Sequence, residues 1–565
     1  MTRLEKALHP RLLAQAALGV SLLLVVSCSR TEPTQEVAPA EPAPVSENGK
    51  AVAPETKAAG TDRGALLAQA KDLFVNHCAA CHGETGDGRG DAAKWLYPRP
   101  RNFRSAEFRI VTTTNGIPSD ADLLAVLDRG MPGSAMPPFS HLPQSDKTAL
   151  VAYVRDLSAR GIEQQLLDDA KAFGDEPDRD EVAEMVAART HPGEVLMIPA
   201  LDAVSPEAVA RGAKVYAEAC AACHGTTGKG DGTERQFNSD GSPTRPRDFT
   251  RGIFKGRPEP QDLYARVRAG MPGSPMPAER VLTDEQISDL IAFVLSLSDE
   301  ATRAQAVLQR RNILAHRVEE TLTDDPASPV WSAAEAVPLT MTPLWWQDYE
   351  DLAVQIEALH DGKSLAVRMS WRDSTENMQA VRPQEFEDMA AVQWFKGSPE
   401  PFLGMGNQSG PVDVWLWQPS RQAPLARRPD VDTAYPNMVV DMYPFEQPTD
   451  GPRPHATELQ NQAFVTAWAA GNPRSDPTSA GSTNLEAAGF GTLTARPPVS
   501  QLTTAGASWS DGRWTVVLRR ALGVETGLAL APGERLSIAF AIWDGAARDR
   551  NGQKRITVWQ DLELE

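Results

Sequence analysis

A five-residue pattern, Cys-x-x-Cys-His, occurs twice in this chain and constrains its fold more than any other feature. The first copy begins at Cys78 and the second at Cys220. Each copy is followed by an Arg-Pro-Arg segment that ends in phenylalanine, and then by a Met-Pro-Gly-Ser segment that leads into Met-Pro. These later segments lie at 99–103 and 245–249, and at 131–137 and 271–277. Because the same elements recur in the same order at nearly the same spacing, the sequence indicates a duplicated domain.

The repeated pattern is the attachment signature of c-type haem. Two cysteines about one helical turn apart can form thioethers to the two vinyl groups of one porphyrin, and the histidine that follows lies beneath the iron. A single copy could also be half of a zinc site or a thioredoxin-like redox pair. Zinc needs further Cys or His ligands, however, and a redox pair makes no use of the histidine. We therefore predict two covalent haems, attached through Cys78, Cys81, Cys220 and Cys223, with His82 and His224 as iron ligands.

Each repeat offers two methionines for the sixth iron position, and ligation by histidine and methionine is the cytochrome c pattern. The candidates are Met131 or Met136 in the first repeat and Met271 or Met276 in the second. Both repeats resemble class I cytochromes c, whose Met-Pro ligand loop matches the second methionine of each pair. The resemblance implies Met136 and Met276 as ligands, with the other methionines packed against the porphyrin edge.

Apolar residues at three- and four-residue spacing predict two mainly α-helical cytochrome domains, at 63–162 and 205–300. The closing helices are expected at 147–157 and 284–297. The Arg-Pro-Arg segments either bind haem propionates or lie in solvated loops. Between the domains, we interpret 163–204 as an acidic linker and assign no chemistry to it.

The N-terminal 28 residues are typical of a bacterial export signal. Basic residues precede an apolar run that is too short to cross a membrane and that ends at Cys28. The residues around Cys28 resemble the lipobox of bacterial lipoproteins, which implies that Cys28 becomes the acylated first residue. An ordinary cleaved signal or an uncleaved anchor is the alternative. We expect residues 1–28 to be a signal, 29–62 a disordered tether, and the protein to be lipid-anchored on the periplasmic side of a bacterial membrane.

The charge and the cysteine content narrow the class of protein further. A formal net charge of −19 argues against nucleic acid and against electrostatic binding to anionic lipid. Five cysteines are present, four in the haem motifs and one at Cys28, so no disulfide is predicted.

The C-terminal part changes from helical spacing to alternation of apolar and polar residues. Examples are Val354, Ile356 and Ala358 in one run and Leu536, Ile538 and Phe540 in another. Short alternating strands joined by Asp-Gly and Asn-Gly turns predict an all-β, antiparallel β-sandwich domain. We place it at 325–565, with an insertion at about 418–508 that contains a helix-like segment at 458–469.

Two segments of this domain, around 402–417 and 540–554, resemble the haem-binding domain of ethylbenzene dehydrogenase gamma subunits. Relatives in that family serve dimethylsulfide, selenate and chlorate molybdoenzymes. The resemblance implies a non-covalent haem b between Met405 and Lys554, and a molybdopterin oxidoreductase as partner. The other two lysines after residue 300, Lys363 and Lys396, lie in turn contexts that favour solvent. A lysine binds iron only when it is neutral, which burial favours.

The chain is thus expected to be a membrane-tethered multihaem carrier that moves electrons between a partner oxidoreductase and a soluble or membrane redox carrier. Irons with six protein and porphyrin ligands leave no position for substrate, and no catalytic residue set stands out. Two alternatives remain open. The sandwich could be a haem-free module that binds carbohydrate through exposed tryptophans, or one c-type haem could be the catalytic centre of a dihaem peroxidase.

Overall fold

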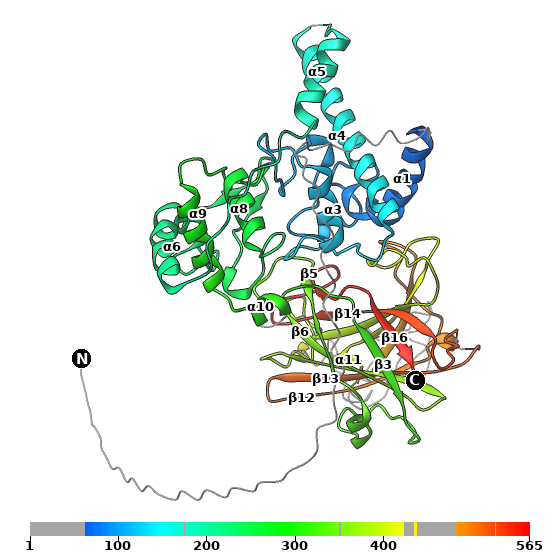
Figure 1. Ribbon diagram of the computed structural model, residues 1–565. Helices are drawn as coiled ribbons and strands as arrows, with labels where there is room; N and C mark the ends of the chain where they lie inside the picture. Colours follow the sequence, from blue (N-terminus) through cyan, green and yellow to red (C-terminus); the bar gives the residue numbers. More distant parts are fainter. Residues whose placement is uncertain (1–62, 175, 350–351, 423–433, 438–480, 526) are drawn as a thin grey trace, which may run out of the picture. The chain divides into compact units, whose positions relative to one another are not determined.

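The computed structural model describes residues 63–174, 176–349, 352–422, 434–437, 481–525 and 527–565 (Figure 1). The predicted signal at 1–28, with Cys28, and the tether at 29–62 lie outside the described residues. The helix-like segment at 458–469 lies outside them as well. Within the described part, a helical region precedes a large and mostly antiparallel sheet, as the sequence predicts.

The first repeat folds around two helices, α1 and α4, that pack on each other. Buried Phe74 of α1 contacts Tyr153 of α4, with ring centroids 5.2 Å apart, and Leu150 lies in the same cluster. Short helices and loops surround this pair. The elements are α1 (Arg63–His77), α2 (Ala79–His82), η1 (Ala93–Trp95), η2 (Phe103–Ser105), α3 (Asp120–Arg129) and α4 (Gln144–Phe173).

The second repeat has the same arrangement, with α6 packed on α9. Ser205 caps α6, Pro206 begins it, and Thr283 with Gln286 forms a capping box on α9. Gly212 lies at the crossing, where a Cβ atom would stand only 1.9 Å from the backbone oxygen of Asp289. The elements are α6 (Pro206–Ala219), α7 (Ala221–His224), β1 (Gln236–Phe237), β2 (Pro243–Thr244), η3 (Phe249–Arg251), α8 (Pro260–Ala269), α9 (Asp284–Ser296) and α10 (Glu300–Gln305).

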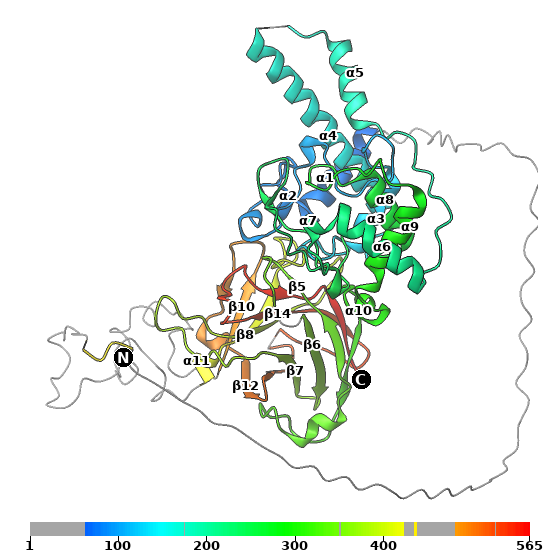
Figure 2. The same cartoon turned by 90° about the vertical axis from the view of Figure 1, so that its left-hand side faces the viewer.

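The segment interpreted as an acidic linker is largely helical. α4 continues to Phe173, well past residue 162, and α5 (Arg179–Thr190) follows it, so that the two helices lie side by side in Figure 2. Gly161 of α4 lets this helix pack closely on η2, because a Cβ there would lie 2.4 Å from the backbone oxygen of Arg104. Asp178 then caps α5 through its side chain.

The described part of the C-terminal domain contains a 14-stranded sheet, with the order β11-β10-β9-β8-β14-β16-β3-β6-β7-β13-β12 along its main path. The pairs are antiparallel except β16 with β3 and β3 with β6. The longer strands are β3 (Asn312–Arg317), β6 (Ala353–His360), β7 (Ser364–Arg372), β8 (Met389–Phe395), β9 (Val412–Trp417), β10 (Ser482–Ala487), β12 (Thr503–Ser510), β13 (Arg513–Ala521), β14 (Arg535–Trp543) and β16 (Gln560–Leu564). The shorter elements are η4 (Pro329–Ala333), β4 (Val337–Thr340), β5 (Thr342–Pro343), α11 (Pro419–Gln422), β11 (Thr494–Ala495), η9 (Pro498–Ser500) and β15 (Arg555–Ile556).

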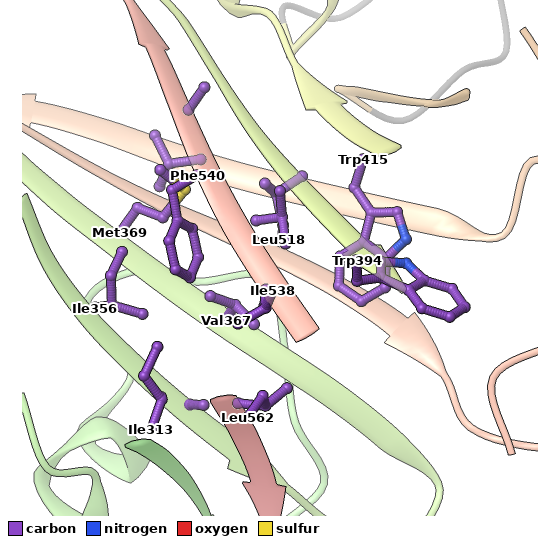
Figure 3. Packing of buried hydrophobic residues seen from close by; sticks show 14 of the residues in the cluster. Ile313, Ile356, Val367, Met369, Trp394, Trp415, Leu518, Ile538, Phe540 and Leu562 are labelled. Carbon is purple, nitrogen blue, oxygen red and sulfur yellow. The ribbon is translucent and has the colours of Figure 1, made fainter. Parts of the chain in front are cut away.

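The sheet folds over so that strands far apart in its order face each other. Trp417 of β9 and Trp514 of β13 lie 5.0 Å apart between ring centroids, although these strands are not neighbours. Figure 3 shows the resulting core, in which Phe540 and Ile538 of β14 face residues of the opposite layer. The alternating side chains of the sequence therefore bury one face of each layer, which is the arrangement of a β-sandwich.

The tryptophans of this domain mostly belong to its core rather than to its surface. Eight of those described after residue 330 are less than 9% exposed. The expectation of exposed tryptophans, on which the carbohydrate-binding alternative depended, is therefore wrong for the described residues. Indoles in a packed core cannot stack on a sugar ring.

Two details of the domain differ from the sequence-based boundaries. β3 belongs to the sheet although it lies before residue 325, because it pairs with β16 at the far end of the chain. β10 lies within 418–508 and β12 begins there, yet both belong to the sheet, so that range is not wholly an insertion. Among the described residues, no helix is both long and apolar enough to cross a membrane.

Candidate haem sites

The histidine of the first motif is oriented by its backbone surroundings. His82 ends the one-turn helix α2, and its Nδ1 lies 2.9 Å from the backbone oxygen of Arg101. Its ring stacks on Phe103 with centroids 4.4 Å apart. Nδ1 therefore carries the proton and donates it to the carbonyl, which leaves Nε2 as the free ligand atom. Burial lowers the pKa of His82 to about 4, so the imidazole is neutral and suited to iron.

The second motif repeats this geometry. His224 ends α7 and stacks on Phe249 with ring centroids 4.9 Å apart. Burial again lowers its pKa to about 4, and the backbone of Arg247 acts in the opposite direction. Nδ1 of His224 is buried and, among the described residues, interacts more weakly with the Arg247 backbone than Nδ1 of His82 does with the Arg101 backbone. The second imidazole is thus neutral like the first but less firmly oriented.

The four motif cysteines are free thiols in the chain itself and form no disulfide. Burial raises the pKa of Cys78 and of Cys81 to about 12, and that of Cys220 to about 11. A redox-active Cys-x-x-Cys pair depends on a lowered thiol pKa. The environment of these thiols therefore argues against the thioredoxin-like alternative and fits cysteines that serve as covalent attachment points.

The methionine loops have one conformation in both repeats. The N–H of Met131 donates to the carbonyl of Met136 at 3.1 Å, and Met271 donates to Met276 at the same distance. Gly130 precedes the first loop with a φ of 69° and lies so close that a Cβ would stand 2.6 Å from the Met136 oxygen. The repeat is therefore conserved in backbone geometry as well as in sequence.

A single apolar cavity brings the residues predicted for the first haem together. His82, Cys78, Cys81 and both methionines of the first loop line it. Phe402 and Leu403, which precede Met405 in the β domain, line the same cavity, as does Ile556, which follows Lys554. Both Met131 and Met136 reach the cavity, so the choice of Met136 as ligand stays a prediction.

Basic side chains gather around this cavity. Arg247 is buried and donates to the backbone oxygen of Pro132 at 3.0 Å, so the solvated-loop alternative is wrong for this residue, whereas Arg245 of the same motif is exposed. The cavity is also lined by Arg101, Arg109 and Lys255. Burial lowers the pKa of each of these side chains. A group of buried cations needs anions nearby. Two propionates on each haem would supply them.

Sequence reasoning missed Arg109 and Lys255, although the repeat contains a signal for both. Each residue follows the second phenylalanine of a pair, Phe103 with Phe108 and Phe249 with Phe254, and both pairs stack in the structure. When the match between the segments 99–103 and 245–249 is extended by six residues, Arg109 aligns with Lys255.

The residues predicted for a third haem lie on one side of the β domain. Met405 adopts a φ of 76°, a left-handed conformation that costs a non-glycine residue free energy. The Lys554 ammonium lies 4.6 Å from the centre of the Trp543 ring, and Met405 packs on the hydrophobic cluster that contains Trp543. Burial lowers the pKa of Lys554 to about 8, which increases the neutral fraction that an iron requires. Lys396, by contrast, pairs with Glu534 at 3.0 Å in a solvent-accessible position.

Two Cys-x-x-Cys-His helices, each accompanied by a methionine loop, define an electron-transfer cytochrome with two c-type haems. The cytochrome c family model matches residues 67–158 and 209–298, and the ethylbenzene dehydrogenase model matches 328–555. The chain consists of two cytochrome c domains followed by an ethylbenzene dehydrogenase-type domain.

The curated relatives of the chain are subunits of larger redox enzymes. A Haloferax mediterranei protein described as a respiratory nitrate reductase haem subunit is 26% identical over 43% of this chain and 70% of its own length. The chlorate reductase gamma subunit of Ideonella dechloratans is 28% identical over 48% of this chain and 93% of its own. The dimethylsulfide dehydrogenase gamma subunit of Rhodovulum sulfidophilum is 25% identical over 37% of this chain and 58% of its own.

Proposed function

We propose that the protein is an exported electron-carrying subunit with two c-type haems and one haem b. The observation that carries the proposal is the recurrence, in both repeats, of a neutral motif histidine and a methionine loop of the same backbone geometry, which one cavity joins in the first repeat. Haem supplies reversible one-electron chemistry when bound. The chain contributes the ligands, excludes water through the apolar lining, and balances the propionates with Arg101, Arg109, Arg247 and Lys255.

Carbon monoxide tests whether these irons carry electrons or react with substrate. An iron that retains His and Met ligands has no open position, so reduced protein should show no change in its visible spectrum under carbon monoxide. A dihaem peroxidase, the competing hypothesis, needs one open iron. A carbon monoxide adduct at about one iron per chain would therefore contradict the carrier function.

The haem b would lie between Met405 and Lys554. The left-handed backbone of Met405 supports this role, because strained residues concentrate at functional sites. The lowered pKa of Lys554, its position over the Trp543 ring and the packing of Met405 on the cluster that contains Trp543 support it as well. In this role the sulfur of Met405 and the neutral Nζ of Lys554 hold the iron, and the chain needs no further ligand.

The partner would be a molybdopterin-dependent oxidoreductase, with a soluble or membrane cytochrome as the second redox partner. This proposal extends to this chain the role of the three relatives as subunits of redox enzymes. Affinity purification from the native host, followed by metal analysis, tests it directly. Molybdenum should co-purify at about one atom per chain, and its absence from a complex that retains all its haem would contradict the proposal.

The protein would be anchored through acylated Cys28. The resemblance of the sequence around Cys28 to a lipobox supports the proposal. A lipid anchor would hold the domains beside membrane partners. The expressed full-length protein should enter the detergent phase of a Triton X-114 partition, and the Cys28→Ser variant should remain in the aqueous phase. Equal partition of the two proteins would contradict lipidation.

A further inference from the structure

Three aspartates converge at one end of the β domain, and none of them belongs to a haem site. Asp373 follows β7, Asp388 precedes β8 and Asp544 follows β14. One carboxylate oxygen of each lies within 4.8 Å of the others. Trp543 of β14 pairs with Met389 of β8 in antiparallel orientation. Asp544, which follows Trp543, and Asp388, which precedes Met389, therefore lie at the same end of these two strands.

The hydrogen bonds around the cluster hold its members but leave one oxygen unpaired. Asp388 is fully buried and accepts N–H groups from Asn377, Gly545 and the Trp514 indole at 2.8–2.9 Å. Asp373 is only 4% exposed, and its Oδ1 accepts from the backbone of Thr375 at 3.1 Å. Its Oδ2 is buried with no hydrogen-bond partner among the described residues. A buried carboxylate oxygen without a donor is costly, so a proton, a water molecule or a cation has to satisfy this atom.

The charge of the cluster leads to the same requirement. Burial, and after it the charge of Asp544, raises the pKa of Asp373 to about 6. Burial and the charge of Asp373 raise the pKa of Asp388 to about 7. Arg555 is the cation whose charge acts on Asp373, and it acts on Asp549 too. One arginine cannot neutralise three adjacent carboxylates, so the cluster must take up protons or bind a cation.

We propose that Asp373, Asp388 and Asp544 form a structural binding site for Ca²⁺. The cluster contains carboxylate oxygens and no histidine or cysteine, which favours a hard cation over zinc, copper or iron. Three carboxylates on separate strand ends suit the flexible coordination of Ca²⁺, whereas Mg²⁺ usually keeps most of its water. Water would complete the coordination.

A cation here would join three strand ends that are distant in sequence. It would also fix the start of the segment that runs from Asp544 to Lys554. The second consequence rests on the proposed haem b site, while the cation site itself does not.

The site is tested on full-length, haem-loaded protein that has been treated with EGTA and then freed of chelator. Isothermal titration with CaCl₂ should give about one binding event per chain, and the melting temperature should rise by roughly 5 °C at saturating Ca²⁺. Mg²⁺ at the same concentration should give a smaller shift. An absent binding event, or an equal response to both ions, would overturn the proposal.

Two variants and a control separate the site from general effects of charge. Asp373→Asn and Asp544→Asn should lose both the binding event and the Ca²⁺-dependent shift. Asp511→Asn, an exposed turn position in the same domain, should keep them. If either cluster variant fails to fold, the titration of the wild-type protein decides alone. Loss of haem b on EGTA treatment would show that the cation stabilises the segment that carries Lys554. Retention of haem b would not affect the conclusion from the Ca²⁺ titration.

Discussion

The cytochrome domains and the β domain hold their redox groups in opposite ways. In each cytochrome domain, five consecutive residues supply the two attachment cysteines and one iron ligand, and the covalent bonds hold the haem even if the rest of the site is disturbed. The proposed site in the β domain joins Met405 and Lys554, which are about 150 residues apart in the sequence and follow the neighbouring strands β8 and β14. A local covalent site should therefore survive damage to the domain, whereas a non-local site should depend on every strand between its ligands.

Removal of the second motif should have the largest effect on this comparison. In Cys220→Ala/Cys223→Ala, one of two covalent haems should disappear, because no thioether can form. Haem staining after denaturing electrophoresis should fall by about half, and extractable haem b should not change. If covalent haem persisted at two per chain, the assignment of the motif would be wrong.

Lys554→Ala should remove the haem of the β domain and leave both covalent haems. The alanine supplies no nitrogen for the iron, so the extractable haem should fall from about one per chain to near zero. Lys363→Ala is the matched control, since Lys363 is exposed at a turn. Equal haem b in both variants would exclude Lys554 as a ligand.

The methionine loops give a smaller and graded effect. Met136→Ala should lower the potential of one c-type haem on the order of 0.1 V or more, a fraction of the ~0.8 V range that axial ligands span. Met131→Ala should change it far less. A spectroelectrochemical titration measures the haem potentials of both variants. A larger change in Met131→Ala than in Met136→Ala would indicate that Met131 is the ligand.

The smallest effect concerns the helix crossings, which differ between the two cytochrome domains. Gly212→Ala should destabilise the second domain by about 1–3 kcal/mol, because the new methyl group meets the backbone of Asp289. At the matching position of α1 the chain has Ala70, fully buried. Ala70→Gly should cost about 1 kcal/mol through helix propensity alone. Thermal unfolding followed at the haem absorbance measures the destabilisation caused by each variant. Equal destabilisation by Gly212→Ala and Ala70→Gly would contradict the proposed difference between the two helix crossings.

Sequence reasoning succeeded where the chemistry is local and less well where it depends on pairing. The haem motifs and the alternation of β-strands are visible in short windows, so the fold class and the covalent sites could be predicted. The start of the sheet could not, because β3 owes its place to parallel pairing with β16 at the other end of the chain. Lys255 and Arg109 could have been found by a longer repeat match. The meeting of Asp373, Asp388 and Asp544 could not, since it follows from how the sheet folds over.

The haem content of the purified protein tests the account most directly. A pyridine haemochrome spectrum, taken before and after acid–acetone extraction, separates covalent from extractable haem. We expect two c-type haems and one extractable haem b per chain. Two c-type haems with no extractable haem would contradict the three-haem carrier and leave the β domain without a redox role.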